Sequence, residues 1–194
     1  MTTNRAKTSD VIGGGLIANS MPSDSAKATG KYIVECFDKD GNPKWTAETP
    51  NLVVNVGLQY MAGSALVATT QITTWYVGLY GAGASNTPAA TDTMAAGGHN
   101  GWTENTSYSE ATRPVANFAA ATNANPSVVT NTSNKAVFTM NATTTIGGAF
   151  LVSNNTKAGT TGTLFSAADF QAPGDRAVVS GDILNVTYQF SLSA

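Results

Sequence analysis

Hydrophobic and polar residues alternate with a period of two over several parts of the chain, most regularly near its C-terminus. From Leu184 to Leu192 every second residue is apolar, and the residues between them are polar. This alternation predicts a β-strand with one buried face. Three further segments with apolar alternation or short apolar runs predict strands: 136–140, with Ala136, Phe138 and Met140 on one face, 146–153 and 163–170.

Turn residues between β-favourable segments predict two hairpins. Residues 32–37 favour a strand, and Asp40–Gly41 supplies a tight turn into residues 43–48. Near the C-terminus, residues 176–192 form a second hairpin-like pair around Ser180–Gly181–Asp182.

One segment is predicted to be helical, over residues 51–67. Pro50 and Asn51 form a plausible start, with Asn51 as the N-cap. Apolar residues then recur at helical spacing, although the valines among them favour a strand: Leu52, Val56, Tyr60, Met61 and Ala65.

The stretch at 73–83 carries large residues on both faces of a predicted strand, because Trp75, Val77 and Leu79 alternate with Tyr76, Gly78 and Tyr80. A strand of this kind is covered on both sides. We expect the second face to be covered by the preceding helix or by a neighbouring subunit. Residues 81–101 are rich in Gly, Ala, Asn and Thr and predict a long surface loop, where contact with a partner is expected.

Many short strands with turns between them predict a mainly β fold: an antiparallel β-sandwich or jelly-roll-like domain with one short helix. We assign residues 31–194 to this single domain and residues 1–30 to an extended, flexible N-terminal arm. The arm carries Gly13–Gly15 between two apolar pairs, Val11–Ile12 and Leu16–Ile17. These pairs are expected to pack on their own domain or to dock on a partner.

Composition favours a packed assembly, although a neutral monomeric β-domain fits equally well. Charged residues are 11% of the chain, against about 25% in an average domain, and 28 Thr and 17 Asn supply the polarity instead. Polar surfaces with few charges meet without a large desolvation cost.

The charge pattern predicts no nucleic-acid partner, since the net charge is −2 and no basic residue lies between Lys44 and Arg113. Six of the ten basic residues lie in the first 44 residues, where mixed charges are expected to keep the segment solvated. The single cysteine, Cys36, is expected to be a small core residue in a chain that folds in a reducing compartment. We also expect no signal peptide and no membrane span, because no apolar run is long enough.

Candidate catalytic and metal-binding residues are few, and we expect no enzyme activity, cofactor or metal. His99 is the only histidine. Residues 38–42 resemble the start of a calcium loop, but Gly41 comes too early and a hairpin turn accounts for them. Glu104 and Glu110 lie in one polar loop, where charged residues are expected, and do not indicate a catalytic pair of carboxylates. No phosphate-binding glycine loop is present.

The aromatic residues divide into core and contact candidates. Trp45 and Trp75 lie in predicted strands and are expected in the core. Trp102 follows the Gly-rich loop, so Trp102 and His99 join Val11, Ile12, Leu16 and Ile17 as expected partner-contact residues.

Residues 31–194 resemble a family of tailed-bacteriophage virion structural proteins, most of all capsid cement or decoration proteins. The resemblance lies in the order of the following segments: YIVECFDKDGNPKW, PNLVVNVGLQYM, TTWYVGLYG, DTMAAGGHNGWTENTSYSEATRP, IGGAFLVS, GTLFSAADF and RAVVSGDILNVTYQFSL.

The resemblance implies a protein made in the bacterial host cytoplasm and placed on the outer surface of the capsid. Its partner would be the major capsid protein at capsomer junctions, and it would act as a homo-oligomer, a dimer or trimer, without catalytic residues. The alternative is a tail fibre or receptor-binding module that contacts host surface glycans.

Overall fold

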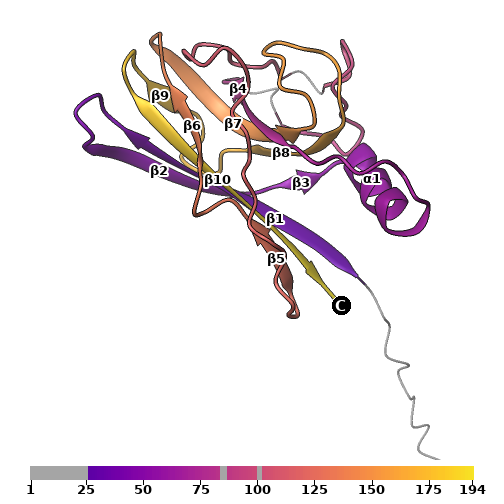
Figure 1. Ribbon diagram of the computed structural model, residues 1–194. Helices are drawn as coiled ribbons and strands as arrows, with labels where there is room; N and C mark the ends of the chain where they lie inside the picture. Colours follow the sequence, from indigo (N-terminus) through magenta and orange to yellow (C-terminus); the bar gives the residue numbers. More distant parts are fainter. Residues whose placement is uncertain (1–25, 84–86, 100–101) are drawn as a thin grey trace, which may run out of the picture.

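The computed structural model describes residues 26–83, 87–99 and 102–194. These residues form two β-sheets and one helix, and Figure 1 shows the helix at one side of the molecule. The described chain is mainly β and both sheets are antiparallel, which confirms the predicted fold class. The four predicted contact residues Val11, Ile12, Leu16 and Ile17 lie outside the described residues.

The first sheet is built on the two longest strands, which pair along their whole length. Tyr32 lies opposite Tyr188 in this pair, and their rings are 4.7 Å apart. The strands β5 and β6 both pair with the other edge of β10. The members of this sheet are β2 (Pro43–Pro50), β1 (Lys27–Phe37), β10 (Ile183–Ser193), β5 (Ser127–Thr130) and β6 (Ala136–Thr139).

The second sheet is centred on β7, whose last seven residues are all buried. A strand buried on both faces reads as a continuous apolar run, which explains the sequence from Ile146 onward. The members of this sheet are β3 (Leu52–Val53), β8 (Leu164–Asp169), β7 (Thr144–Val152), β4 (Tyr76–Gly81) and β9 (Arg176–Val178).

The main core lies between the two sheets. Alternate residues of β1 and β10 meet alternate residues of β4 and β7, as the period-two pattern predicted. The fully buried contributors include Val34, Val186, Val77 and Leu79. Cys36 belongs to this core, as expected, and burial together with nearby Asp182 raises the pKa of its thiol to about 12.

The predicted hairpin between β1 and β2 is confirmed, including its turn. Gly41 has φ 85°, a conformation that favours glycine. The Asp38 carboxylate accepts hydrogen bonds from the backbone N–H groups of Asp40 and Asn42, at 2.9 and 2.8 Å. These bonds make residues 38–42 a turn closed by its own side chain.

The predicted C-terminal hairpin is wrong. β9 pairs with β7 in the second sheet, whereas β10 belongs to the first. Residues 180–182 therefore form a corner that carries the chain between the sheets. Asp182 stabilises this corner. Its buried carboxylate accepts a hydrogen bond from the N–H of Val179 at 2.9 Å and forms an ion pair with Lys44.

A second core covers the outer face of the second sheet. Tyr80 and Phe150 point to this side, where the segment after β4 contributes Met94 and Trp102. Val56 of the helix lies only at the edge of this cluster. The second face of β4 is therefore covered mainly by the chain that follows it. The described residues after β4, 82–83 and 87–99, form an irregular and largely exposed loop, as predicted, but Asp92 and Met94 within it are buried.

Candidate functional site

The helix α1 (Asn55–Leu66) begins later than predicted, because the residues before it extend the second sheet. Leu52 and Val53 pair with β8, and Val54 stands at the N-cap without a side-chain hydrogen bond. The predicted cap, Asn51, instead donates a hydrogen bond from its amide to the hydroxyl of Tyr188 at 2.9 Å. The assignment of Asn51 as the N-cap is therefore wrong, since a sheet pairing replaced the first turn.

The outward stripe of α1 is apolar, which is unusual for a helix at the edge of a domain. Leu58 and Leu66 are 45% and 84% exposed, and Ala62 lies between them at helical spacing. The next residue, Val67, is 74% exposed. No charged residue occurs in α1. A solvent-facing row of apolar side chains on a helix is a surface suited to a protein partner, and this row is here called the α1 stripe.

The inner side of α1 is held against β8 by a glycine. A Cβ atom on Gly57 would lie 2.3 Å from the carbonyl oxygen of Phe165, so only glycine allows this close approach. Tyr60, one turn further on, packs edge-on against Trp75, with the ring centroids 5.4 Å apart. Its hydroxyl accepts a hydrogen bond from the backbone N–H of Ile72. The position of the α1 stripe is thus fixed by the sheet beneath it.

Replacing Gly57 with alanine is expected to destabilise the protein, although alanine is the better helix former. The new methyl group would meet the Phe165 backbone, and overpacking of this kind costs about 1–3 kcal/mol. Gly63→Ala in the same helix is the matched control, because its methyl group meets only the side chain of exposed Thr69. That change should be neutral or stabilise by up to about 1 kcal/mol. Urea unfolding measures both, and equal stabilities would contradict the tight packing of α1.

An apolar hollow lies between the two sheets, and it opens next to β5. Its volume is about 140 Å³. Its aromatic lining is ordered by edge-on contacts, with Phe165 at 5.4 Å from Trp75 and 5.5 Å from Phe190. Burial raises the pKa of the lining residue Tyr188 above its ordinary value. The residues of this apolar hollow are Trp75, Phe118, Val129, Leu151, Phe165, Tyr188 and Phe190.

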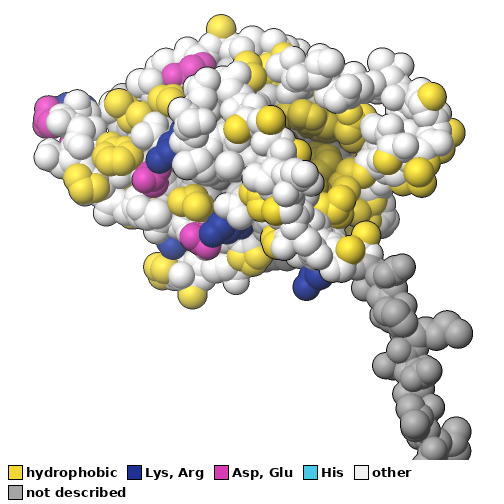
Figure 2. Space-filling view, turned by 60° about the horizontal axis from the view of Figure 1, so that its bottom comes forward, with side chains coloured by type: hydrophobic (Ala, Val, Ile, Leu, Met, Phe, Trp, Pro, Cys, Tyr) yellow, Lys and Arg dark blue, Asp and Glu magenta, His cyan; other side chains and the backbone are white. Residues whose placement is uncertain are grey.

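Figure 2 shows hydrophobic side chains gathered in a depression on the face near the start of β1, with few charged side chains around them. Phe118, Val129 and Phe190 are each only partly buried. The sandwich is therefore not closed at this end by the described residues, and it presents apolar surface to whatever covers it.

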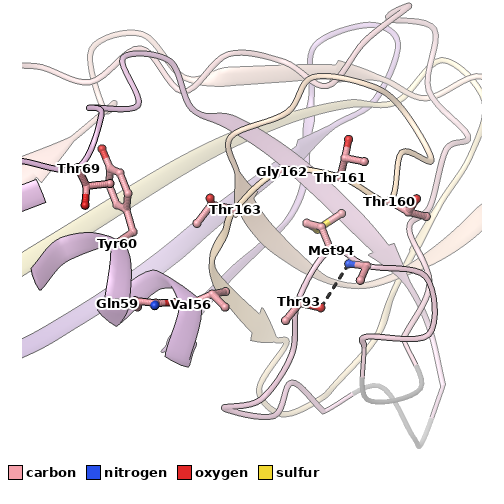
Figure 3. A pocket seen from close by; sticks show the side chains of 11 residues that line it. Val56, Gln59, Tyr60, Thr69, Thr93, Met94, Thr160, Thr161, Gly162 and Thr163 are labelled. Carbon is pink, nitrogen blue, oxygen red and sulfur yellow. Dashed lines mark hydrogen bonds between the residues drawn. The ribbon is translucent and has the colours of Figure 1, made fainter. Parts of the chain in front are cut away.

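A larger pocket lies beside α1 (Figure 3), and because six of its eleven lining residues carry a hydroxyl group it is here called the hydroxyl pocket. Its volume is about 690 Å³. Figure 3 shows Tyr60 and Thr69 on one side, residues 160–163 opposite, and Thr93 with Met94 on a third side. The lining residues are uncharged and offer hydrogen bonds to a polar ligand: Val56, Gln59, Tyr60, Thr69, Thr93, Met94, Ala95, Thr160, Thr161, Gly162 and Thr163.

The two predicted contact residues His99 and Trp102 lie together, but Trp102 is in the second core. Its indole is 2% exposed, packs between Tyr80 and Phe150, and donates a hydrogen bond from Nε1 to Asp92 at 2.8 Å. The His99 ring stacks on the indole at 3.9 Å and is half-buried. Trp102 was expected to contact a partner, but its ring is buried and covers the outer face of the second sheet.

Sequence reasoning missed a buried ion pair in the same segment. The guanidinium of Arg113, 1% exposed, makes two hydrogen bonds to the carboxylate of Glu104, at 2.9 and 2.7 Å. Arg113 also donates to the carbonyls of Asn154 and Gly159, while Glu104 accepts the N–H of Ala158. Glu104 is therefore not a solvated loop residue. No periodic pattern in the sequence marks this pair.

The ion pair fixes the long segment after β4 to the loop between β7 and β8. Thr160 to Thr163, which line the hydroxyl pocket, follow directly after Gly159. The pair therefore holds one wall of that pocket in place.

Among residues 26–83, 87–99 and 102–194, no group of three His, Cys, Asp or Glu side chains is placed to hold a metal ion. The helix that the structure describes is too short to cross a membrane. A scan against protein-family models, a search of curated proteins and a search of solved structures each found no match.

Proposed function

We propose that this protein is a non-enzymatic cement or decoration protein of a tailed-phage capsid, which binds the outer surface of the shell at capsomer junctions. The observation that carries the proposal is the α1 stripe, an exposed apolar surface on a β-sandwich with few charges. The order of sequence segments that resembles phage virion proteins supports the choice of the major capsid protein as the partner.

A weakly binding apolar surface is sufficient on a capsid, because the shell offers many identical binding sites. Burying an exposed leucine side chain contributes about 1.5–3 kcal/mol, so Leu58 and Leu66 together give a modest affinity for each copy. Many copies on a symmetric shell gain avidity, above all when each bound unit is a homo-oligomer, a dimer or trimer. Stability of the particle would then come from many small apolar contacts added to its outside.

The test compares two double variants of the full chain on purified capsids that lack this protein. Leu58→Gln with Leu66→Gln removes the apolar character of the α1 stripe. Val137→Gln with Val179→Gln is the matched control, because these valines are 43% and 45% exposed elsewhere on the molecule. We expect the α1 variant to bind at least about tenfold more weakly, the factor for 1.4 kcal/mol, and to protect capsids less from heat.

The control variant should bind like the unchanged protein. Equal binding of the two variants would contradict the role of the α1 stripe, and failure of the unchanged protein to bind capsids at all would contradict the proposed function. Image reconstruction of the virion gives a second readout, since the proposal requires density over the whole shell.

A second candidate function is a tail fibre or receptor-binding module, and the hydroxyl pocket favours it. Threonine hydroxyls and the Gln59 amide suit the hydrogen-bonding groups of a glycan. The buried state of Trp102 removes the aromatic platform that a sugar ring would stack on. Density confined to the tail, with glycan binding reduced by Thr161→Val, would favour this candidate over the capsid.

A further inference from the structure

We infer that the chain closes the apolar hollow with its own N-terminal segment, through the apolar pairs Val11–Ile12 and Leu16–Ile17. The inference rests on the lining of the hollow, on the place where the chain enters the sandwich and on the length of the segment before that place. It does not depend on the proposed capsid function.

The hollow has the size and chemistry for an aliphatic side chain. An apolar cavity of about 150 Å³ accepts a guest the size of benzene, and the hollow is close to that volume at about 140 Å³. Its lining residues are uncharged, and so is the segment from Val11 to Ile17. Contact between them therefore buries apolar surface without removing a charge from water.

The chain enters the fold beside this hollow. Lys27 pairs with Ser193, Ala28 with Leu192, and Gly30 with Phe190, which lines the hollow. Leu192 is 39% exposed and lies two residues from Phe190, so the apolar surface extends toward the point of entry. The N-terminal segment therefore joins β1 at the open end of the sandwich, next to the apolar hollow.

The segment before Lys27 is long enough to return to the hollow. Residues 18–26 separate Ile17 from Lys27, and an extended chain of that length spans up to about 30 Å. A linker of nine residues holds the attached group at an effective concentration in the millimolar range. A second copy at micromolar concentration competes poorly with such a tether, and we therefore assign the hollow to the segment of the same chain.

The first experiment is disulfide trapping in the full chain. Leu16→Cys is combined with Val129→Cys, which lines the hollow, or with Val137→Cys, an exposed residue of β6 outside the hollow lining. The native Cys36 stays in place because its thiol is buried. Under mild oxidation of dilute protein, we expect an intrachain disulfide in the first variant at several times the yield of the second.

Each other outcome overturns the inference. Disulfide-linked dimers in the first variant would show that the segment enters the hollow of a second copy. Equal yields in the two variants, or no disulfide in either, would show that Leu16 does not reside at the hollow.

A second measurement does not depend on the geometry of a disulfide. Replacing Val11, Ile12, Leu16 and Ile17 together with serine leaves every described residue unchanged. Fluorescence of a dye that binds apolar surface should rise several-fold in this variant, because the hollow is uncovered. Unchanged dye binding would contradict the inference, and since no capsid is used, the result is independent of shell binding.

Discussion

Glu104→Gln is expected to lower the free energy of unfolding by about 3–5 kcal/mol, the usual cost of removing one partner from a buried ion pair. Glutamine has nearly the shape of glutamate, so the change removes the charge and little volume. The Arg113 guanidinium then keeps its charge in a site where its side chain is fully buried. Two backbone carbonyls, those of Asn154 and Gly159, remain as acceptors but cannot neutralise it.

The matched control is Glu48→Gln, which removes one charge from the exposed pair between Lys31 and Glu48. These side chains are 36% and 57% exposed, and such surface pairs contribute about 0–1 kcal/mol. Urea unfolding of both variants gives the comparison directly. A similar decrease in the free energy of unfolding for the two variants would contradict the burial of the Glu104–Arg113 pair.

A double-mutant cycle separates the pair from the rest of its surroundings. Arg113→Met alone leaves the Glu104 carboxylate buried, whereas Arg113→Met with Glu104→Gln leaves no buried charge at this position. The double variant should therefore lose less stability than the sum of the two single variants. Additive losses would contradict direct coupling between the two side chains.

The strands could be predicted because strand burial is a local and periodic property. In β10, Leu184, Val186 and Tyr188 alternate with residues that point the other way. Only one face of this strand meets the core between the sheets, so the alternation shows which residues are buried. The β1–β2 turn could be predicted for a similar reason, since Asp38 and Gly41 supply its chemistry within five residues.

Pairing partners could not be predicted, because they depend on residues far away in the chain. The sequence around residues 180–182 suits a hairpin turn as well as a corner between sheets. The corner forms instead of the hairpin because β9 pairs with β7 and because Lys44 forms an ion pair with Asp182. Leu52 and Val53 likewise continue a helical pattern, yet their pairing with β8 turns them into a strand.

The candidate site was predicted least well, because apolar residues occur on more than one side of α1 and do not show which side faces solvent. The resemblance and the composition pointed to a contact surface, and the α1 stripe is made of residues that were read as an ordinary helix. Trp102 and Arg113 lie in irregular segments, where neither a period of two nor one of 3.6 marks a buried side chain. The absence of charge in residues 49–91 was the one available signal, since it spans α1 and its connection to β4.

Trp102→Ala is expected to lower the free energy of unfolding by about 3–5 kcal/mol, the range for a large aromatic side chain removed from a core. The change leaves a cavity between Tyr80 and Phe150 and removes the hydrogen bond to Asp92. Trp102→Phe keeps most of the volume but loses the Nε1–H donor, so its cost should be clearly smaller. Thermal and urea unfolding of both variants measure the difference.

His99→Ala is the control that separates a core role from a contact role for this aromatic pair. The ring of His99 stacks on Trp102 from the more exposed side, so its loss should cost about 0.5–1.5 kcal/mol, the value of one aromatic contact. Below its melting temperature, the Trp102→Phe variant should still bind capsids like the unchanged protein, because the indole lies beneath other side chains. Weaker binding by Trp102→Phe at unchanged stability would instead show that this ring contacts a partner directly, and would move the contact surface from α1 to the segment that follows β4.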